Sequence, residues 1–475
     1  MRFSDKTFFQ WFDYSLLAIL LVFGLVAVLL TGGSALHLRI VPTLAIGLTI
    51  LLGILWWGRQ RTFAAKTPEN PTEWKLLWTL LAIGVTLRLL WWLLIHSQLV
   101  LQSDFAVYFN SAEHMAKFWE YRVFEREGLL IAYRPPGTVF LLSLVMMITG
   151  IVSWAPVALN LFYFTATGWL LWKTIRPKVT QAAALGALSL FTFWPSDIMF
   201  ASLPQSENPT LLGIALLMFL ATRRQANPRL WEMTTGLLTG LLCLVRNSNL
   251  LLTGLWSLVA LRSPQPWSKR IVSCTLIALF TFLPILPWTY RNFRMLGSPV
   301  LVATNGGENL YSANNDVTDG GWDPTVSGVR IYLPDELKMD RIAKQLAIDW
   351  IRTHPLKFLK LAVNKLRILM SDDNQGPYDT LERGIGYTGP GLLAAQLIAN
   401  FWWLLLWGLV LTSLRYYSLW RDDPDAYIML ALATIPSLLF LIFQSQSRYH
   451  VPMVPPLLFL AAYTLSFRSR SQDPR

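Results

Sequence analysis

The sequence predicts an all-α membrane protein that crosses the bilayer many times. Of its 475 residues, 54% are hydrophobic and only 14% are charged, whereas soluble proteins carry about 25% charged residues. Apolar runs of about 17 to 23 residues, the length that a helix needs to cross a bilayer, recur along nearly the whole chain. They are close to evenly distributed, so no large soluble domain is expected.

About twelve apolar segments are expected to cross the membrane. They cover residues 15–31, 40–57, 76–95, 155–173, 181–198, 207–222, 231–246, 248–261, 271–290, 392–414, 427–444 and 451–467. A further apolar segment, 136–151, is shorter and opens with Pro136-Gly137. Whether this segment crosses decides the orientation of every loop after it.

Basic residues decide the orientation, because Lys and Arg favour cytoplasmic loops. They form five clusters: Arg59, Arg61, Lys66 and Lys75; Lys173, Arg176 and Lys178; Arg223, Arg224 and Arg229; Arg262, Lys269 and Arg270; and Arg468 and Arg470. All five clusters can be cytoplasmic together only if 136–151 does not cross. We therefore expect 136–151 to be a juxtamembrane or re-entrant helix on the outer side. Both termini are then cytoplasmic, and two long outer loops remain, 96–135 and 291–391.

The second outer loop combines turns with amphipathic helices. Its start is rich in Gly, Asn and Asp at Thr304–Asn309 and Asn314–Asp316, which predicts turns. Helical patterns follow over Asp335–Thr353 and Pro355–Met370, with a break at His354. The second pattern places Lys and Arg among Leu, Phe and Ile, so this helix is expected at the level of the lipid headgroups.

The net charge of +12 does not indicate nucleic-acid binding. Such binding needs a basic face or tail, whereas these basic residues lie in short segments between apolar runs. The two cysteines, Cys243 and Cys274, fall within apolar segments. They indicate small buried side chains, not a disulfide or zinc framework.

Two acids lie at the outer ends of predicted spans. Asp104 precedes Tyr108 by four residues, which places both on one face of a short helix. Glu207 opens the span 207–222. Each has an ordinary explanation, since Asp104 can cap a helix and Glu207 can complement the positive end of a helix. Their shared side and similar depth favour a common site instead.

Four arginines lie at outer ends of spans, against the inward preference of positive charge: Arg134, Arg246, Arg291 and Arg448. An arginine near lipid costs several kcal/mol of insertion free energy and marks a functional site by default. Guanidinium suits two-point contact with phosphate. For Arg134, which precedes two prolines, the alternative is simple anchoring of the following helix.

These residues together resemble the GT-C superfamily of membrane glycosyltransferases. The resemblance is to bacterial relatives of protein O-mannosyltransferases and of the transferases that put aminoarabinose on lipid A. It depends on short motifs in family order: Asp104-x-x-x-Tyr108-x-x-x-Ala112, Tyr133-Arg134-Pro135-Pro136-Gly137, Ser206-Glu207, Leu244-Val245-Arg246, Pro287-Trp288-Thr289-Tyr290-Arg291-Asn292, Thr304-Asn305-Gly306-Gly307 and Arg448-Tyr449-His450-Val451-Pro452. Spans 15–31 and 40–57 look like an amino-terminal addition, and Asn247 stands where relatives usually have proline.

The resemblance implies inverting transfer of a sugar from a polyprenyl phosphate to an acceptor on the periplasmic face of a bacterial inner membrane. It implies that Asp104 is the catalytic base, that Glu207 is a second acid, and that Arg134 lies near the donor phosphate, where the aminoarabinose transferases have a lysine. The shared outward location of Arg134, Arg246, Arg291 and Arg448 predicts that they include the ligands of the donor phosphate. Substrate contacts are expected from Tyr108, Tyr133, Asn305 and Tyr449. Whether a divalent metal takes part stays open, as do the sugar and the acceptor, which can be a glycan, a lipid or a protein.

The expected organisation has four parts: two amino-terminal helices in 1–75, a catalytic membrane module in 76–290, the outer loop in 291–391 and the carboxy-terminal helices in 392–475. Membrane lipids are expected partners. A transporter or lipid flippase is an alternative, but it would place charges at the membrane midplane and repeat its halves, and the sequence shows neither pattern. An inactive scaffold with the same fold is the other alternative.

Overall fold

The computed structural model describes residues 5–34, 48–49, 53, 61–63, 71–125, 128–321, 335–415, 417, 420 and 422–469. In this part of the chain, helices dominate and strands form only two short antiparallel pairs. One pair joins β1 (Arg61–Phe63) to β4 (Phe467–Ser469), and the other joins β2 (Val123–Glu125) to β3 (Gly128–Leu130). The all-α architecture expected from the sequence is therefore found, with two small additions.

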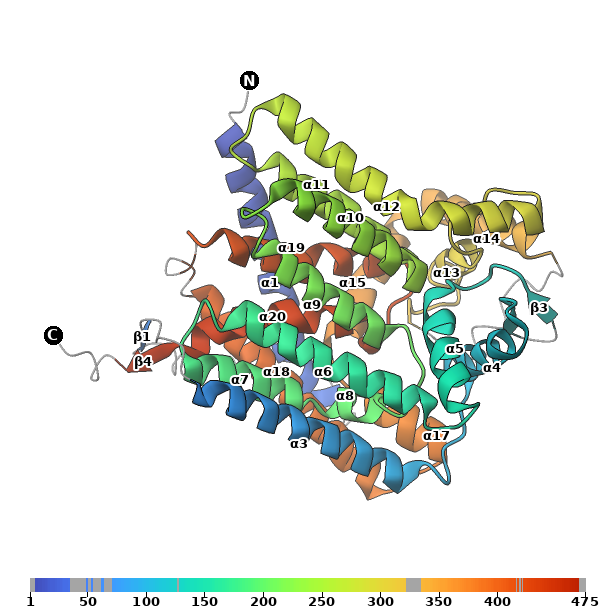
Figure 1. The fold of residues 1–475 in the computed structure, drawn as a ribbon, viewed down its shortest axis with the longest axis horizontal. Helices are drawn as coiled ribbons and strands as arrows, with labels where there is room; N and C mark the ends of the chain where they lie inside the picture. The colour runs from blue at the N-terminus through green and yellow to red at the C-terminus, as the bar shows by residue number, and fades with distance from the viewer. Residues whose placement is uncertain are drawn as a thin grey trace.

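Apolar helices of different lengths lie side by side in one bundle (Figure 1). They are α1 (Asp5–Ser34), α3 (Thr72–Ile95), α6 (Ala155–Ile175), α7 (Gln181–Thr192), α9 (Glu207–Ala221), α10 (Pro228–Val245), α11 (Leu251–Leu261), α12 (Trp267–Leu296), α18 (Pro390–Arg415), α19 (Pro424–Leu438) and α20 (Val454–Leu465). Five stretches of the described residues are long and apolar enough to cross a membrane: Phe9–Thr31, Thr72–Ile95, Trp267–Leu296, Pro390–Arg415 and Pro424–Leu441. The chain is thus a multi-pass membrane protein. The expected span 40–57 lies almost entirely outside the described residues.

Several expected spans are interrupted near one end. Segment 181–198 divides into α7 and α8 (Pro195–Phe200), because Pro195 cannot continue the ladder of helical hydrogen bonds. Tighter 3₁₀ turns flank other helices: η2 (Asn247–Leu250) before α11, η6 (Leu439–Leu441) after α19 and η7 (Ser447–Met453) before α20. Irregular backbone at membrane depth is tolerated where protein buries it or where it lines a cavity.

Close helix contacts hold the bundle together. Gly236 and Gly240, one turn apart on α10, face α12. A Cβ atom at these positions would lie 2.5 Å from the carbonyl oxygen of Ile277 and 2.1 Å from that of Thr281. Small residues at this spacing let the two backbones approach closely, which gains dispersion contacts where lipid offers no hydrophobic driving force. The large core beside this seam includes fully buried tryptophans such as Trp403 and Trp407.

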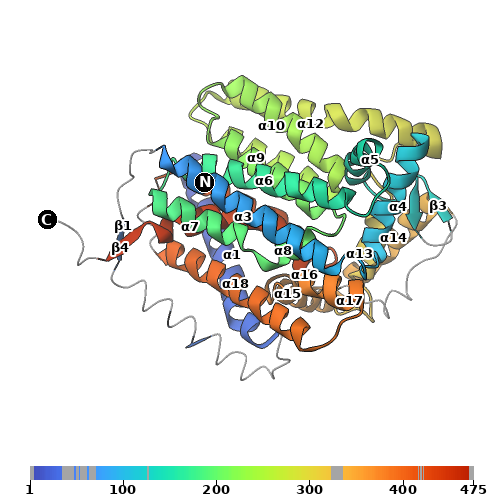
Figure 2. The ribbon, with the colours of Figure 1, turned by 60° about the horizontal axis from the view of Figure 1, so that its bottom comes forward.

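A group of shorter helices lies beyond one end of the bundle. It contains α4 (Ser103–Phe118), α5 (Gly137–Thr149), α13 (Gly306–Ser312) and α14 (Glu336–Thr353), and Figures 1 and 2 both show it at the end opposite the β1–β4 pair. Residues of α4, α5 and α14 share a buried cluster that includes Val107, Val139 and Met339. On α13, a Cβ atom at Gly307 would lie 2.0 Å from the carbonyl oxygen of Asp340 on α14, so these two helices are in close contact. We call this group the outer cap.

The helix α5 begins and ends in the outer cap. A Cβ atom on Gly137 would lie 2.8 Å from the carbonyl oxygen of Leu244, at the end of α10. Ala155, the first residue of α6, belongs to the same buried cluster as Val139 and Leu142 of α5. Thirteen residues make a helix of about 20 Å, which is shorter than a hydrocarbon core of about 30 Å.

The second outer loop, 291–391, forms both of the helices that were expected in it. The structure has α14 over Glu336–Thr353 and α15 over Pro355–Met370, with His354 between them. Leu356, Leu359 and Val363 leave an apolar face of α15 exposed. The position of this helix at the level of the lipid headgroups stays a prediction. The turn expected over Thr304–Asn309 is partly helical instead, since α13 begins at Gly306. After α15 come α16 (Gln375–Pro377), η4 (Tyr378–Glu382) and α17 (Arg383–Ile385).

Candidate active site

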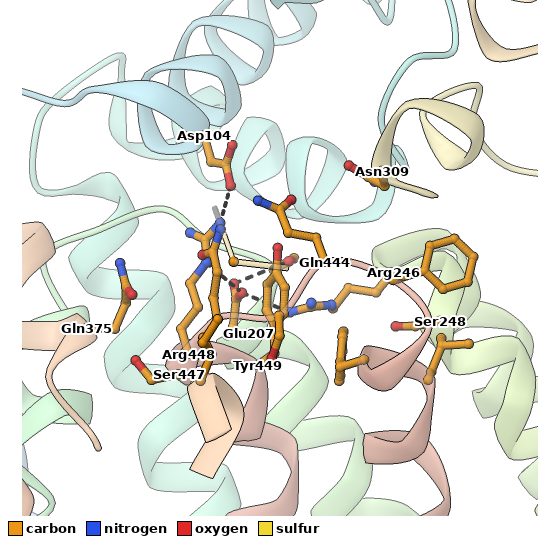
Figure 3. Close-up of a pocket in the computed structure, with 18 of the residues that line it drawn as sticks. Asp104, Glu207, Arg246, Ser248, Asn309, Gln375, Gln444, Ser447, Arg448 and Tyr449 are labelled. Atoms are coloured by element: carbon orange, nitrogen blue, oxygen red, sulfur yellow. Dashed lines mark hydrogen bonds and ion pairs between the residues drawn. The ribbon is translucent and has the colours of Figure 1, made fainter. Parts of the chain in front are cut away.

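A cavity of about 950 Å³ lies between the bundle and the outer cap. Its lining includes nine of the residues expected from the sequence: Asp104, Tyr108, Tyr133, Arg134, Glu207, Arg246, Asn305, Arg448 and Tyr449. These residues come from distant parts of the chain, and the fold brings them together at the point where helices start or end. Figure 3 shows several of them converging.

Inside the cavity, arginines and carboxylates alternate. Arg134 Nη2 donates to Asp104 Oδ1 at 2.9 Å, and Arg448 Nη2 donates to Asp104 Oδ2. Arg246 Nη1 donates to Glu207 Oε1 at 2.8 Å, and Arg448 Nε lies 3.6 Å from the same oxygen. Arg448 therefore bridges the two acids, as Figure 3 shows. We call these five residues the charged chain; it carries three cations and two anions.

The arginines change the acidity of Asp104. Burial acts to raise the pKa of this carboxyl, but the positive charges of Arg134 and Arg448 outweigh burial and hold the pKa well below its usual range. Asp104 is therefore ionised at neutral pH. A carboxylate held this tightly accepts a proton poorly, so its basicity rises only if an arginine moves away from it.

The segment that carries Arg134 is fixed by the outer cap. Tyr121 Oη donates to the carbonyl oxygen of Arg134 at 2.7 Å, and the Tyr133 hydroxyl donates to the Glu308 carboxylate on α13. At the start of α14, Glu336 accepts from the backbone N–H groups of Ile131 and Ala132, each at 3.1 Å. Helices 175 to 205 residues later in the chain thus position a cation that the sequence places in the first outer loop.

Tyr449 supports the other two arginines. The Arg246 guanidinium carbon lies 5.0 Å from the centre of the Tyr449 ring, and that of Arg448 lies 5.6 Å from it. The ring of Phe440 stacks on Tyr449 with centroids 4.7 Å apart. A cation over an aromatic face is stabilised by about 0.5 to 2 kcal/mol, so Tyr449 helps to keep two positive charges close together.

Arg291 lies elsewhere. Its Nη1 donates to the carbonyl oxygen of Ile131 at 2.7 Å, its Nη2 donates to that of Tyr121 at 2.9 Å, and its guanidinium lies over the Trp288 ring at 4.7 Å. Arg291 does not belong to the cavity lining. The structure therefore separates it from the three other arginines, because its charge is used to tie α12 to the first outer loop. A position at the outer end of a span could not distinguish these two uses.

Sequence reasoning missed one whole side of the cavity. Asp372, Asn374, Gln375, Gln396 and Gln444 line it. A usable signal was present, since Ser371–Gln375 and Gln444–Ser447 are polar runs that directly adjoin apolar segments. The second run also directly precedes Arg448.

A buried ion pair outside the cavity was also missed. Arg88 on α3 and Asp197 on α8 are 1% and 5% exposed, and Arg88 Nε donates to Asp197 Oδ2 at 3.2 Å. Arg88 falls in the middle of the expected span 76–95, and Asp197 falls at the outer end of the expected span 181–198. The break at Pro195 lets this acid turn towards α3.

Comparison with known proteins gives the fold. No protein-family model matches the sequence, and no curated protein matches it. Among solved structures, the oligosaccharyltransferase of Archaeoglobus fulgidus in the apo form aligns with a TM-score of 0.52 at 12% identity, over 82% of this chain and 50% of that chain. The chain thus spans about half the length of the archaeal enzyme.

This chain has the GT-C fold. Two further solved structures align less well. The ArnT of Cupriavidus metallidurans bound to undecaprenyl phosphate has a TM-score of 0.43 at 13% identity, over 84% of this chain and 78% of that chain. The AglB of Archaeoglobus fulgidus, in complex with an inhibitory peptide and a dolichol-phosphate, has a TM-score of 0.49 at 12% identity, over 83% and 50% of the two chains. At such identities the likeness concerns the fold.

No metal ligand set can be assigned in this GT-C fold. Among the described residues, no group of three or more His, Cys, Asp or Glu side chains is placed to hold a metal ion. The acids of the charged chain face guanidinium groups. We therefore propose no described residue as a ligand of a divalent metal.

Proposed function

We propose that this chain is a glycosyltransferase that moves a sugar from a polyprenyl-phosphate donor to an acceptor, with inversion, on the outer face of a bacterial inner membrane. The charged chain carries this proposal. Three arginines and two carboxylates meet at the wall of a large cavity at the end of a membrane bundle. The GT-C fold supports glycosyl transfer as the reaction class.

The donor phosphate binds at the arginines. Guanidinium groups bind phosphate oxygens with two-point geometry, and here three of them exceed the carboxylates by one charge. Apolar side chains line a neighbouring part of the same cavity, among them Val245, Leu251 and Phe443. They suit the first isoprene units of the lipid, whose hydrocarbon is stabilised by leaving water.

Asp104 acts as the general base. The acceptor hydroxyl attacks the anomeric carbon, the bond from that carbon to the phosphate oxygen breaks, and Asp104 takes the hydroxyl proton. The leaving polyprenyl phosphate keeps the electron pair, and the arginines stabilise its negative charge. Because the donor phosphate competes with Asp104 for Arg134 and Arg448, donor binding raises the pKa of Asp104 towards its ordinary value. Glu207 stays with Arg246 and orients it.

The proposed topology has twelve crossings, cytoplasmic termini and an α5 that returns to the outer side. Three predicted cytoplasmic clusters support it. The β1–β4 pair joins Arg61 to Ser469 at the end away from the outer cap (Figure 1). Lys178 Nζ lies 2.9 Å from Asp423 Oδ1, and Arg224 pairs with Asp425. Labelling of a cysteine at Ser153 only from the cytoplasm would rule this topology out, and Gln181 is the matched site expected to be cytoplasmic.

The decisive experiment follows the fate of the donor. Purified protein in detergent is given a radiolabelled polyprenyl-phosphate sugar and candidate acceptors, and release of bare polyprenyl phosphate is measured with transfer of the label. Cleavage that depends on Asp104 supports the proposal. In proteoliposomes, movement of the intact donor across the membrane without cleavage would favour the transporter alternative, and binding without either outcome would favour an inactive scaffold.

A further inference from the structure

A lysine without an acidic partner is buried behind the wall of the cavity. Lys365 on α15 is 0% exposed, and among the described residues no carboxylate forms an ion pair with it. Burial lowers the pKa of its amine to about 8, so the amine is still mostly protonated at neutral pH. A buried cation without an anion costs free energy that an apolar side chain of similar size does not. Lys365 therefore indicates a purpose other than packing.

The Lys365 amine joins three segments that lie far apart in the sequence. Its Nζ donates to Asn314 Oδ1 at 2.8 Å and to the carbonyl oxygen of Ile442 at 3.0 Å. Asn314 Nδ2 donates to the same carbonyl oxygen at 2.9 Å. A Cβ atom on Gly320 would lie 2.7 Å from Lys365 Cγ, so the lysine also packs against the segment that follows Asn314. Two donors from two different segments thus hold Ile442.

Ile442 begins the segment that carries Arg448. We call residues 442–450 the arginine segment; all of 443–449 line the cavity, and Figure 3 shows Arg448 beside its acids. At the far end of the arginine segment, His450 Nδ1 lies 3.0 Å from the carbonyl oxygen of Leu369. Lys365 and Leu369 are four residues apart on α15, which places them on one face of this helix. One face of α15 therefore holds both ends of the arginine segment.

The side-chain contacts of Arg448 do not fix it completely. Its Nη2 donates to Asp104, but its Nε is buried without a hydrogen-bond partner and lies 3.6 Å from Glu207 Oε1. Because hydrogen bonds to nitrogen form at about 2.7 to 3.2 Å, a shift of roughly 0.5 Å decides whether Arg448 bonds to both acids. The position of the arginine segment therefore controls which groups Arg448 can reach.

We propose that Lys365 is a positioning residue for donor binding: it fixes the Ile442 end of the arginine segment and thereby places Arg448 for contact with the donor phosphate. A protonated amine has three N–H donors, so it can hold acceptors on two segments at once. Hydrogen bonds from a charged donor are also stronger than those from a neutral one. Lys365 does not line the cavity, so it acts through Arg448. The inference rests on the proposed function, because it assumes that the arginines hold the donor phosphate.

The first measurement compares two lysines of α15. Lys365→Met keeps the approximate length of the side chain and removes its donors. Its affinity for bare polyprenyl phosphate in detergent at pH 7, well below the melting temperature, is expected to fall about three- to tenfold, the effect of one lost hydrogen bond. Lys360→Met is the matched control, because Lys360 is exposed on the same helix. Its affinity should stay within about twofold of wild type.

A double-mutant cycle separates positioning from a purely structural role. If Lys365 acts through Arg448, adding Lys365→Met to Arg448→Gln should change the affinity by less than about twofold, because the effects of coupled residues are not additive. A residue that only stabilises the fold lowers the melting temperature and leaves the affinity of the folded protein unchanged. We expect this second result for Glu73→Gln, which breaks a buried ion pair with Arg176 outside the cavity.

The outcomes separate the inference from the proposed function. If wild-type protein binds no bare polyprenyl phosphate, the proposed function fails and the inference fails with it. If wild type binds this lipid and Lys365→Met binds it equally well, only the inference is overturned. An equal loss with and without Arg448 would overturn it as well. Should Lys365→Met not fold, Asn314→Leu keeps the lysine, removes its side-chain acceptor and carries the same two expectations.

Discussion

Two sets of buried ion pairs in this protein differ in whether their charges balance and in whether they border open volume. We call a pair closed when its charges balance and no cavity adjoins it. At the cytoplasmic end in the proposed topology, Arg176 Nε and Nη2 donate to the two Glu73 oxygens at 2.7 and 2.8 Å, and Nη1 donates to the Val179 carbonyl at 3.1 Å. Both residues are at most 3% exposed. The charged chain of the cavity instead shares three arginines between two acids, and its Asp104 side chain is 23% exposed.

This difference in charge balance and exposure separates an ion pair that stabilises the fold from one that can bind a ligand. A closed pair with matched charges and satisfied donors offers nothing to a ligand, and its purpose is structural. The charged chain has an excess positive charge, a long 3.6 Å contact between Arg448 and Glu207 and open volume beside it. An anion can therefore enter and take arginines from the carboxylates. The following predictions test this contrast, from the largest expected effect to the smallest.

The largest effect is expected from Asp104→Asn. Asn cannot take the acceptor proton, so transfer should fall by about 10²- to 10⁴-fold. Binding of bare polyprenyl phosphate should be unchanged or tighter, because the variant no longer competes with phosphate for Arg134 and Arg448. Turnover of a radiolabelled donor and titration with bare lipid measure the two quantities. Near-normal turnover would remove the catalytic assignment and leave Asp104 only as an ion-pair partner of Arg134 and Arg448.

The closed pair should respond in stability instead. Glu73→Gln leaves the Arg176 charge buried without an ionic partner, which should cost roughly 3 kcal/mol or more of unfolding free energy. Asp104→Asn should cost less, because its arginines border the cavity. Denaturation of both variants in the same detergent gives the comparison. An equal or larger loss for Asp104→Asn would contradict the distinction between closed and open pairs.

Donor binding should separate two arginines that look alike in the sequence. Arg448→Gln removes a cation of the charged chain, so affinity for bare polyprenyl phosphate should fall about tenfold to a hundredfold. Arg291→Gln is the matched control, since its guanidinium is held by backbone carbonyls outside the cavity. Its phosphate affinity should stay within about twofold of wild type. A comparable loss in both variants would restore Arg291 to the phosphate site.

The sequence predicted most of the helices and the charged residues of the cavity. Helix ends beside Asp104, Glu207 and Arg246 were predictable because apolar runs stop there and charges begin. The uncharged lining residues Asn374 and Gln375 were not, because they carry no charge to contrast with the positive-inside rule. Their neighbour Asp373, held by Trp194 and His450, fixes the segment that places them at the cavity. The role of Arg291 likewise depends on carbonyls 160 and 170 residues away in the chain.

The smallest effect concerns the pH dependence of stability at Asp379, which accepts a hydrogen bond from Gln375 Nε2 at 2.9 Å. Burial raises the pKa of this carboxyl to about 6, although Arg448, Gln375 and Arg383 act in the opposite direction. Because the pKa is higher in the folded state than in the unfolded state, protonation of Asp379 favours folding. The stability that it contributes is fully present below about pH 4 and is lost as the pH rises through about 6.

In Asp379→Asn this part of the pH dependence should disappear. Between pH 4 and pH 7, the melting temperature of the wild type depends on Asp379 and on all other titrating groups. The variant shares the other groups and lacks Asp379. The difference between wild type and variant should therefore change by about 1 to 3 °C across this range, with the variant gaining relative to wild type as the pH rises. Arg383→Gln, which removes the nearest positive charge at 3.2 Å, should enlarge the wild-type trend. Parallel pH curves for wild type and Asp379→Asn would mean that Asp379 stays ionised throughout and that its arginine contacts outweigh its burial.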